Sequence, residues 1–91
     1  MNKRKGILDT IDKTSKQLTI LLEVMYRYYK IYDLDFGAVY SEVFYELYIA
    51  EEKLTFESIC QSVGIGMTTL KAYRKRFDNL ATRLLEKGII K

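Results

Sequence analysis

Two glycines separated by one residue, Gly64 and Gly66, form the stretch of this sequence that most suggests ligand chemistry. A glycine-rich loop can wrap a phosphate, because its backbone N–H groups approach the ligand closely. Phosphate loops of the Rossmann and P-loop types follow a buried strand, whereas Phe56, Ile59 and Val63 have helical spacing before this stretch. No Gly-Lys-Ser/Thr follows either. A sharp turn between two helices explains the stretch better.

Catalytic and metal chemistry find little support in the rest of the sequence. The chain has no His and one Cys, which excludes a His-based catalytic dyad, a His/Cys zinc site and a disulfide framework. With no His to activate it, Cys60 is interpreted as a small packed hydrophobic residue. The acidic cluster lacks the spacing of a calcium loop and is interpreted as a solvated face: Glu42, Glu46, Glu51 and Glu52. We expect no enzymatic activity, no metal and no cofactor.

The size and composition predict one small cytoplasmic domain. The 91 residues leave room for a single core, and the hydrophobic fraction of 48% is at the high side of the usual range for a soluble domain. Some apolar surface is therefore expected to be buried between chains. The densest apolar run, from Leu18 to Met25, is broken by Glu23 and is far too short to span a membrane. Basic Lys3-Arg4-Lys5 is not followed by the apolar stretch of a signal peptide.

Charge is distributed unevenly along the chain. Residues 33–57 carry one base and seven acids, a balance of −6, whereas residues 66–91 carry seven bases and two acids, a balance of +5. A basic C-terminal third suggests a polyanionic partner. A solvated helix surface would have the same composition, and charge alone does not separate the two interpretations.

Apolar periodicity predicts an all-α fold of about four helices. The first is clearest from Leu18, with Thr14 as its N-cap in a capping box with Gln17. Asp33-Leu34-Asp35 supplies N-cap candidates for the second helix, which is expected to end near Glu51. The apolar positions of the first helix are Leu18, Leu21, Leu22, Met25, Tyr28, Tyr29 and Tyr32, and those of the second are Phe36, Val39, Tyr40, Val43, Leu47 and Ala50, widened by Phe44 and Tyr48.

The last two helices have clearer boundaries. Thr55 is the N-cap candidate for a short helix from Phe56 to Val63, which Gly64 ends. A long helix then runs from about Met67 to about Lys87, with Gly88 suited to the position after its C-cap. Its apolar positions recur in steps of three and four residues: Leu70, Tyr73, Phe77, Leu80 and Leu84.

These two helices fit the physical demands of a helix-turn-helix over residues 55–87. That motif packs two helices at a steep angle across a turn of three or four residues, often with a Gly. Cys60 is small enough for the crossing, and Gly64 supplies the reversal of the backbone. The apolar residues Ile59, Val63 and Ile65 flank the crossing.

The stretch LTFESICQSVGIGMTTLKAYRKRFDNLATRLL resembles the helix-turn-helix of sigma-factor region 4. It is more similar to the small phage and mobile-element regulators built on that motif, such as the ArpU-type regulators. The resemblance covers roughly residues 40–85 and implies a DNA-binding transcriptional regulator, with RNA polymerase as a possible further partner. Gly66 departs from the pattern, because a Ser or Thr usually caps the recognition helix there. A hydroxyl suited to a phosphate contact is thereby lost.

The long helix carries the candidate DNA-binding residues on the side away from its apolar stripe. Thr68, Lys71, Ala72 and Lys75 are the candidates for base edges, because a recognition helix usually reads bases near its N-terminal end. Asn79 shares this outward side. The flanking candidates for phosphates are Thr69, Arg74 and Arg76. A solvated basic face remains the alternative for the cations.

Two further parts of the chain have more than one interpretation. Lys3-Arg4-Lys5, within a basic N-terminus over residues 1–13, fits a minor-groove arm or a flexible solubilising segment. The tyrosines from Tyr26 to Tyr32 could stack on bases, but their helical phase favours a core or a dimer interface. We expect a homodimer through the first two helices. A helical protein-interaction module without DNA binding and a phage DNA-packaging subunit are the rival functions.

Overall fold

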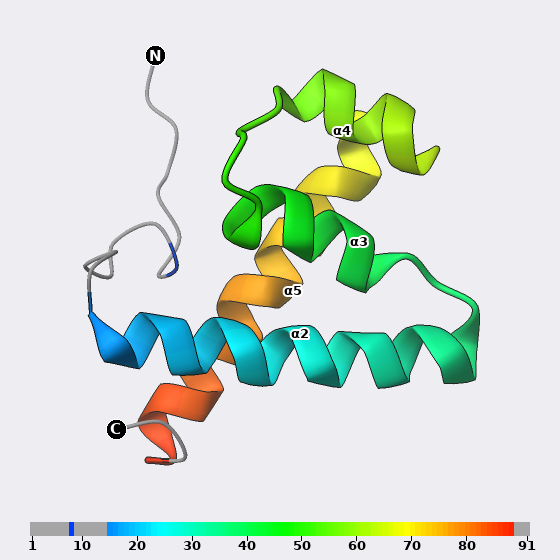
Figure 1. The fold of residues 1–91 in the computed structure, drawn as a ribbon. Coiled ribbons are helices and arrows are strands. Elements are labelled where there is room, and N and C mark those ends of the chain that lie inside the picture. Colours follow the sequence, from blue (N-terminus) through cyan, green and yellow to red (C-terminus); the bar gives the residue numbers. More distant parts are fainter. Residues whose placement is uncertain (1–7, 9–14, 89–91) are drawn as a thin grey trace.

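The computed structural model describes Leu8 and residues 15–88, and these form helices without any strand (Figure 1). The all-α prediction is therefore confirmed. The elements are α2 (Lys16–Phe36), α3 (Tyr40–Phe44), a π-helical turn η1 (Tyr45–Ile49), α4 (Phe56–Val63) and α5 (Met67–Glu86). The basic segment Lys3-Arg4-Lys5 lies outside the described residues. No helix in the described part of the chain is both long and apolar enough to cross a membrane.

The start of α2 is one residue later than predicted. Ser15 is the N-cap, and its side chain accepts a hydrogen bond from the backbone N–H of Leu18 at 3.1 Å. The predicted N-cap, Thr14, and its capping box with Gln17 are therefore wrong. Thr and Ser hydroxyls can both cap a helix, so the residue types alone do not exclude either position.

The end of α2 corrects a second prediction. Asp33-Leu34-Asp35 does not begin the second helix, because α2 continues through it to Phe36 and stops at Gly37 in the left-handed conformation, with φ 64°. Phe36, expected on the apolar side of the second helix, is instead 68% exposed at the end of α2. A left-handed residue is the usual stop for a helix, and glycine adopts that conformation without strain.

Asp33 nevertheless caps the next helix, from within α2. Its carboxylate accepts hydrogen bonds from the backbone N–H of Tyr40 at 3.0 Å, the backbone N–H of Ser41 at 2.8 Å and the Ser41 hydroxyl at 2.6 Å. The two backbone N–H groups are among those that the first turn of a helix leaves without an intrahelical partner. Asp33 thus fixes α3 against the last turns of α2.

The second helix is less regular than its apolar spacing predicted. After Phe44 the helix widens into η1, where the Ala50 N–H donates to the Tyr45 carbonyl at 2.8 Å, five residues back. Tyr40, Val43 and Phe44 are buried as expected, while Leu47 is half-buried. No residue type marks a π-helical turn, so the widening could not be expected from the sequence.

The core lies where α5 crosses α2 and α3, as Figure 1 shows. Phe77 of α5 is fully buried, and its ring centroid lies 5.0 Å from that of Tyr29 and 5.1 Å from that of Phe44. Both pairs are edge-on, an arrangement that aromatic rings favour. Leu8 is buried in the same core, and its backbone N–H donates to the Asp78 carboxylate at 3.2 Å.

Replacing Asp33 by Ala should destabilise the fold, because the first backbone N–H groups of α3 lose their acceptor. We expect Asp33→Ala to lower the free energy of unfolding by about 1–2 kcal/mol, the usual cost of losing a helix cap. Urea unfolding followed by circular dichroism measures the change in the free energy of unfolding. Asp35→Ala is the matched control, because Asp35 is exposed in the same helix. Equal stability of the two variants would contradict the capping role.

Candidate nucleic-acid interface

The helix α4 has the boundaries that the sequence predicts. Thr55 is its N-cap, with its hydroxyl accepting from the backbone N–H of Ser58 at 3.1 Å, and the helix runs to Val63. Ile59 and Cys60 are buried against the core, whereas Glu57 and Ser58 are exposed. Cys60 is thus a packed hydrophobic residue, as predicted.

The Gly64–Gly66 stretch joins α4 to α5 as a three-residue turn. Gly64 adopts φ 82° and ψ 36°, and the N–H groups of Gly64 and Ile65 both donate to the Cys60 carbonyl, at 2.8 and 3.0 Å. Ile65 packs against the core from this corner. Gly66 is the N-cap of α5, with φ −86° and no side-chain hydrogen bond. The stretch follows a helix rather than a strand, in agreement with the prediction of a turn.

The buried side of α5 determines which residues point outward. Leu70, Phe77 and Ala81 are buried, and Gly88 adopts φ 69° after the helix ends, as predicted. All four candidate base-reading residues are exposed, together with Thr69: Thr68, Lys71, Ala72 and Lys75. From Met67 to Phe77 the helix has four bases and no acid. This outward face therefore offers cations, a hydroxyl and a methyl group.

The two candidate arginines, Arg74 and Arg76, pack on aromatic rings beside this face. The Arg74 guanidinium carbon lies 4.7 Å from the centroid of the Phe56 ring in α4, and that of Arg76 lies 5.8 Å from the centroid of the Tyr40 ring in α3. Arg74 is half-buried, whereas Arg76 is exposed. Contacts between a cation and an aromatic face contribute about 0.5–1 kcal/mol at exposed sites. These contacts hold the two arginines on opposite flanks of α5.

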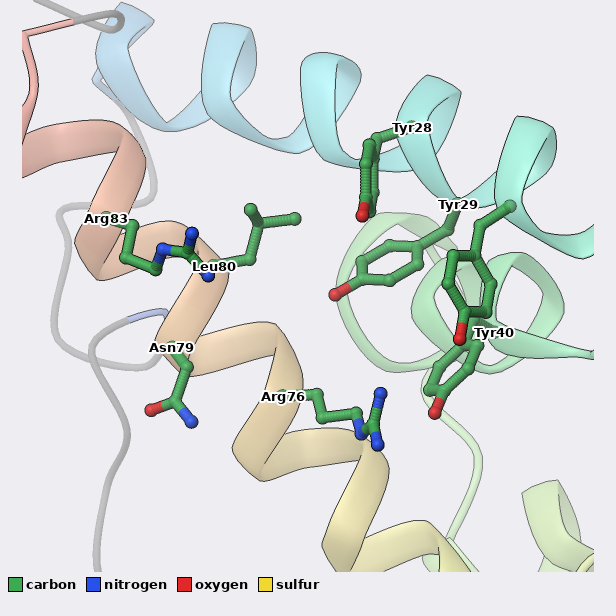
Figure 2. Close-up of a pocket in the computed structure, with 8 residues that line it drawn as sticks. Tyr28, Tyr29, Tyr40, Arg76, Asn79, Leu80 and Arg83 are labelled. Atoms are coloured by element: carbon green, nitrogen blue, oxygen red, sulfur yellow. The ribbon is translucent and has the colours of Figure 1, made fainter.

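A hollow of about 220 Å³ lies between α2 and α5, next to Arg76. Arg76, Asn79, Leu80 and Arg83 line it from α5, as Figure 2 shows. The other lining residues are tyrosines from α2 and α3: Tyr28, Tyr29, Tyr32 and Tyr40. Among the described residues that line the hollow there are two guanidiniums and no carboxylate. Arg83 was not among the sequence candidates, although its position seven residues after Arg76 places it on a similar side of the helix.

Burial affects the ionisation of two tyrosines near this hollow. Desolvation raises the pKa of Tyr29 far above its ordinary value, and the neighbouring Tyr28 and Tyr40 act in the same direction, while Arg76 opposes them. Desolvation also raises the pKa of Tyr73, with further contributions from Tyr40 and Asp33. Both phenols are therefore neutral at physiological pH and keep their hydroxyl protons.

In comparisons of this chain with known protein families, with curated proteins and with solved structures, nothing matches.

The same substitution at the two glycines should have opposite effects on stability. A Cβ at either position meets nothing within 4 Å, so only backbone conformation and capping separate them. We expect Gly64→Ser to cost about 1–2 kcal/mol, because a side chain strains the left-handed conformation. Gly66→Ser should add a few tenths of a kcal/mol, because Ser is a better N-cap than Gly. Thermal and urea unfolding of both variants measures the difference, and equal effects would exclude this account of the turn.

Proposed function

We propose that this chain binds duplex DNA sequence-specifically, with α4, the turn and α5 acting as a helix-turn-helix. In this proposal α5 is the recognition helix and lies in the major groove. The observation that carries the proposal is the exposure of Thr68, Lys71, Ala72 and Lys75 on one side of α5, opposite its buried residues. The resemblance of residues 40–85 to sigma-factor region 4 supports the same function and suggests a transcriptional regulator of phage or mobile-element type.

The chemistry of the outward face fits the edges of base pairs. A lysine ammonium can donate to the acceptors of guanine, a threonine hydroxyl can bond any base, and an alanine methyl can contact the methyl group of thymine. Thr68, Lys71 and Ala72 lie in the first two turns of α5, the part of a recognition helix that usually contacts bases. Lys75 extends the same face by one further turn.

The flanking residues fit the phosphate backbone on either side of the groove. Arg74 lies on the α4 side and Arg76 on the side of α2 and α3, where Arg83 adds a second guanidinium. Guanidiniums bind phosphates through paired hydrogen bonds, which fix the position of a protein on DNA without reading its sequence. Thr69 and Asn79 are exposed and offer further polar groups. Contact with RNA polymerase would be an additional step that the resemblance suggests.

Alanine substitutions of the two lysines should weaken DNA binding without changing the fold. A target sequence is first selected from a random pool of duplexes. Lys71→Ala and Lys75→Ala should then each weaken binding to it by roughly 1–3 kcal/mol where a base contact is lost. Fluorescence anisotropy at several salt concentrations measures the affinity and its salt dependence. Lys87→Ala, which removes the same charge at the far end of α5, is the matched control.

The outcomes separate this function from its rivals. If a lysine reads a base, its Ala variant should discriminate less well between duplexes. If a lysine contacts only phosphate, its Ala variant should bind all duplexes more weakly by a similar factor, and its salt slope should be lower by about one. Tight binding without sequence preference would favour a packaging subunit. No binding to any duplex at low salt would favour a protein-interaction module.

A further inference from the structure

The outer face of α2 carries apolar side chains that the core does not cover. Ile20 is 48% exposed, Ile31 62% and Leu34 86%, and Val24 is exposed beside them. The buried residues of α2 lie on the opposite side of the helix: Leu18, Leu21, Met25 and Tyr29. A contiguous apolar stripe on the surface of a small protein usually marks an interface.

The spacing of this stripe is that of a coiled-coil seam. Ile20, Val24, Arg27, Ile31 and Leu34 follow one another in alternating steps of four and three residues, which correspond to heptad positions d, a, d, a and d. These five residues form the α2 seam. Arg27 is its one charged member. The Arg27 guanidinium pairs with the Glu23 carboxylate at 3.1 Å on the helix surface, so its methylene stem is free to pack.

Charged residues beside the α2 seam determine the orientation of a partner helix. Glu23 and Lys30 both occupy position g, seven residues apart on the same flank, and have opposite charges. When two copies of such a helix pack antiparallel, position g of one faces position g of the other, and charge pairs there select orientation and register. The sequence of α2 is thus complementary to an inverted copy of itself.

One antiparallel register satisfies both the seam and the charges. With Ile20 opposite Ile31 of a second copy, Val24 lies opposite Arg27, and Glu23 lies opposite Lys30 on both sides of the two-fold axis. Moving one helix along the other by seven residues, so that the overlap shifts toward the two C-termini, would instead bring Lys30 of one copy against Lys30 of the other. A parallel pairing in register would bring Arg27 of one copy against Arg27 of the other, which is unfavourable because the two guanidiniums repel each other.

We propose that a second copy of this chain docks antiparallel on the α2 seam in this register, forming a two-fold dimer. The partner is a second copy because the apolar positions and the charge pair both match the same inverted helix. This inference specifies the surface of the expected homodimer. It stands independently of DNA binding, since the seam lies on α2 and the proposed DNA-contacting face lies on α5.

Charge reversal tests the orientation directly. We expect Glu23→Lys and Lys30→Glu each to weaken dimerisation about tenfold, because a two-fold interface repeats each lost pair. The double variant E23K/K30E should restore dimerisation to near the original level. Sedimentation equilibrium measures the dissociation constants, with circular dichroism to check that each variant is folded. Glu52→Lys and Lys53→Glu, at exposed positions outside α2, are the matched controls for the change in net charge.

Disulfide trapping tests the register with different residues. In the proposed register a chain with Ile20→Cys should cross-link to a chain with Ile31→Cys when the two are mixed and oxidised, while Ile20→Cys alone should not cross-link to itself. The native Cys60 is buried within each chain and does not compete. Self-linking of Ile20→Cys, failure of the double charge variant to restore dimerisation, or a monomer at high micromolar concentration would each overturn the proposal. A monomer that still binds duplex DNA would overturn this inference alone.

Discussion

The packing of Phe77 is the constraint on which the arrangement of this chain depends. Its ring is fully buried and contacts rings from α2 and α3. A buried ring of this size stabilises the fold by about 1.5–3 kcal/mol relative to an exposed one, so α5 cannot turn about its axis without a substantial loss. Successive residues of a helix are separated by about 100°, and Lys75 and Lys71 therefore project roughly away from the core when Phe77 projects into it. The outward face of α5 is thus a consequence of core packing.

The rings that surround Phe77 are themselves placed by a polar contact. Asp33 accepts three hydrogen bonds from the first turn of α3, which positions Tyr40 beside Tyr29, with ring centroids 5.3 Å apart. Tyr40 in turn stacks on Tyr73 of α5 at 4.0 Å. The Asp33 carboxylate thus joins α2 to α3, and the Tyr40 ring joins α3 to α5. Because α2 continues past Asp33 to Phe36, this carboxylate is held by a helical backbone.

The sequence predicts best the features that depend on neighbouring residues. The limits of α4 and α5 follow from Thr55 and the glycines, because a hydroxyl caps and a left-handed glycine stops a helix wherever they occur. The end of α2 has the same kind of local stop, Gly37, but Asp33 and Asp35 compete with it as N-cap candidates for the next helix. The π-helical turn was not predictable, since no residue type marks it. The candidate DNA-binding site also combines features that follow from local sequence with features that do not. Periodicity alone places Lys71 and Lys75 outward, whereas the hollow that unites Arg76 and Arg83 with tyrosines of α2 and α3 exists only after the helices cross.

Each of the two long helices has one side buried in the core and a second side with its own surface chemistry. One side of α5 is buried, and the other carries its exposed lysines. One side of α2 is buried and the other carries the proposed α2 seam, so apolar residues nearly encircle it. A 91-residue chain with one core cannot cover both sides of α2, so Ile20, Ile31 and Leu34 stay exposed. If the seam binds a second copy, the two-fold axis requires two equivalent α5 helices in each dimer. Such a pair would suit a duplex with an inverted repeat, because each half-site would meet the same outward face. The requirement for a partner and the symmetry of the proposed DNA target would then share one physical cause, which is the excess of apolar surface on α2.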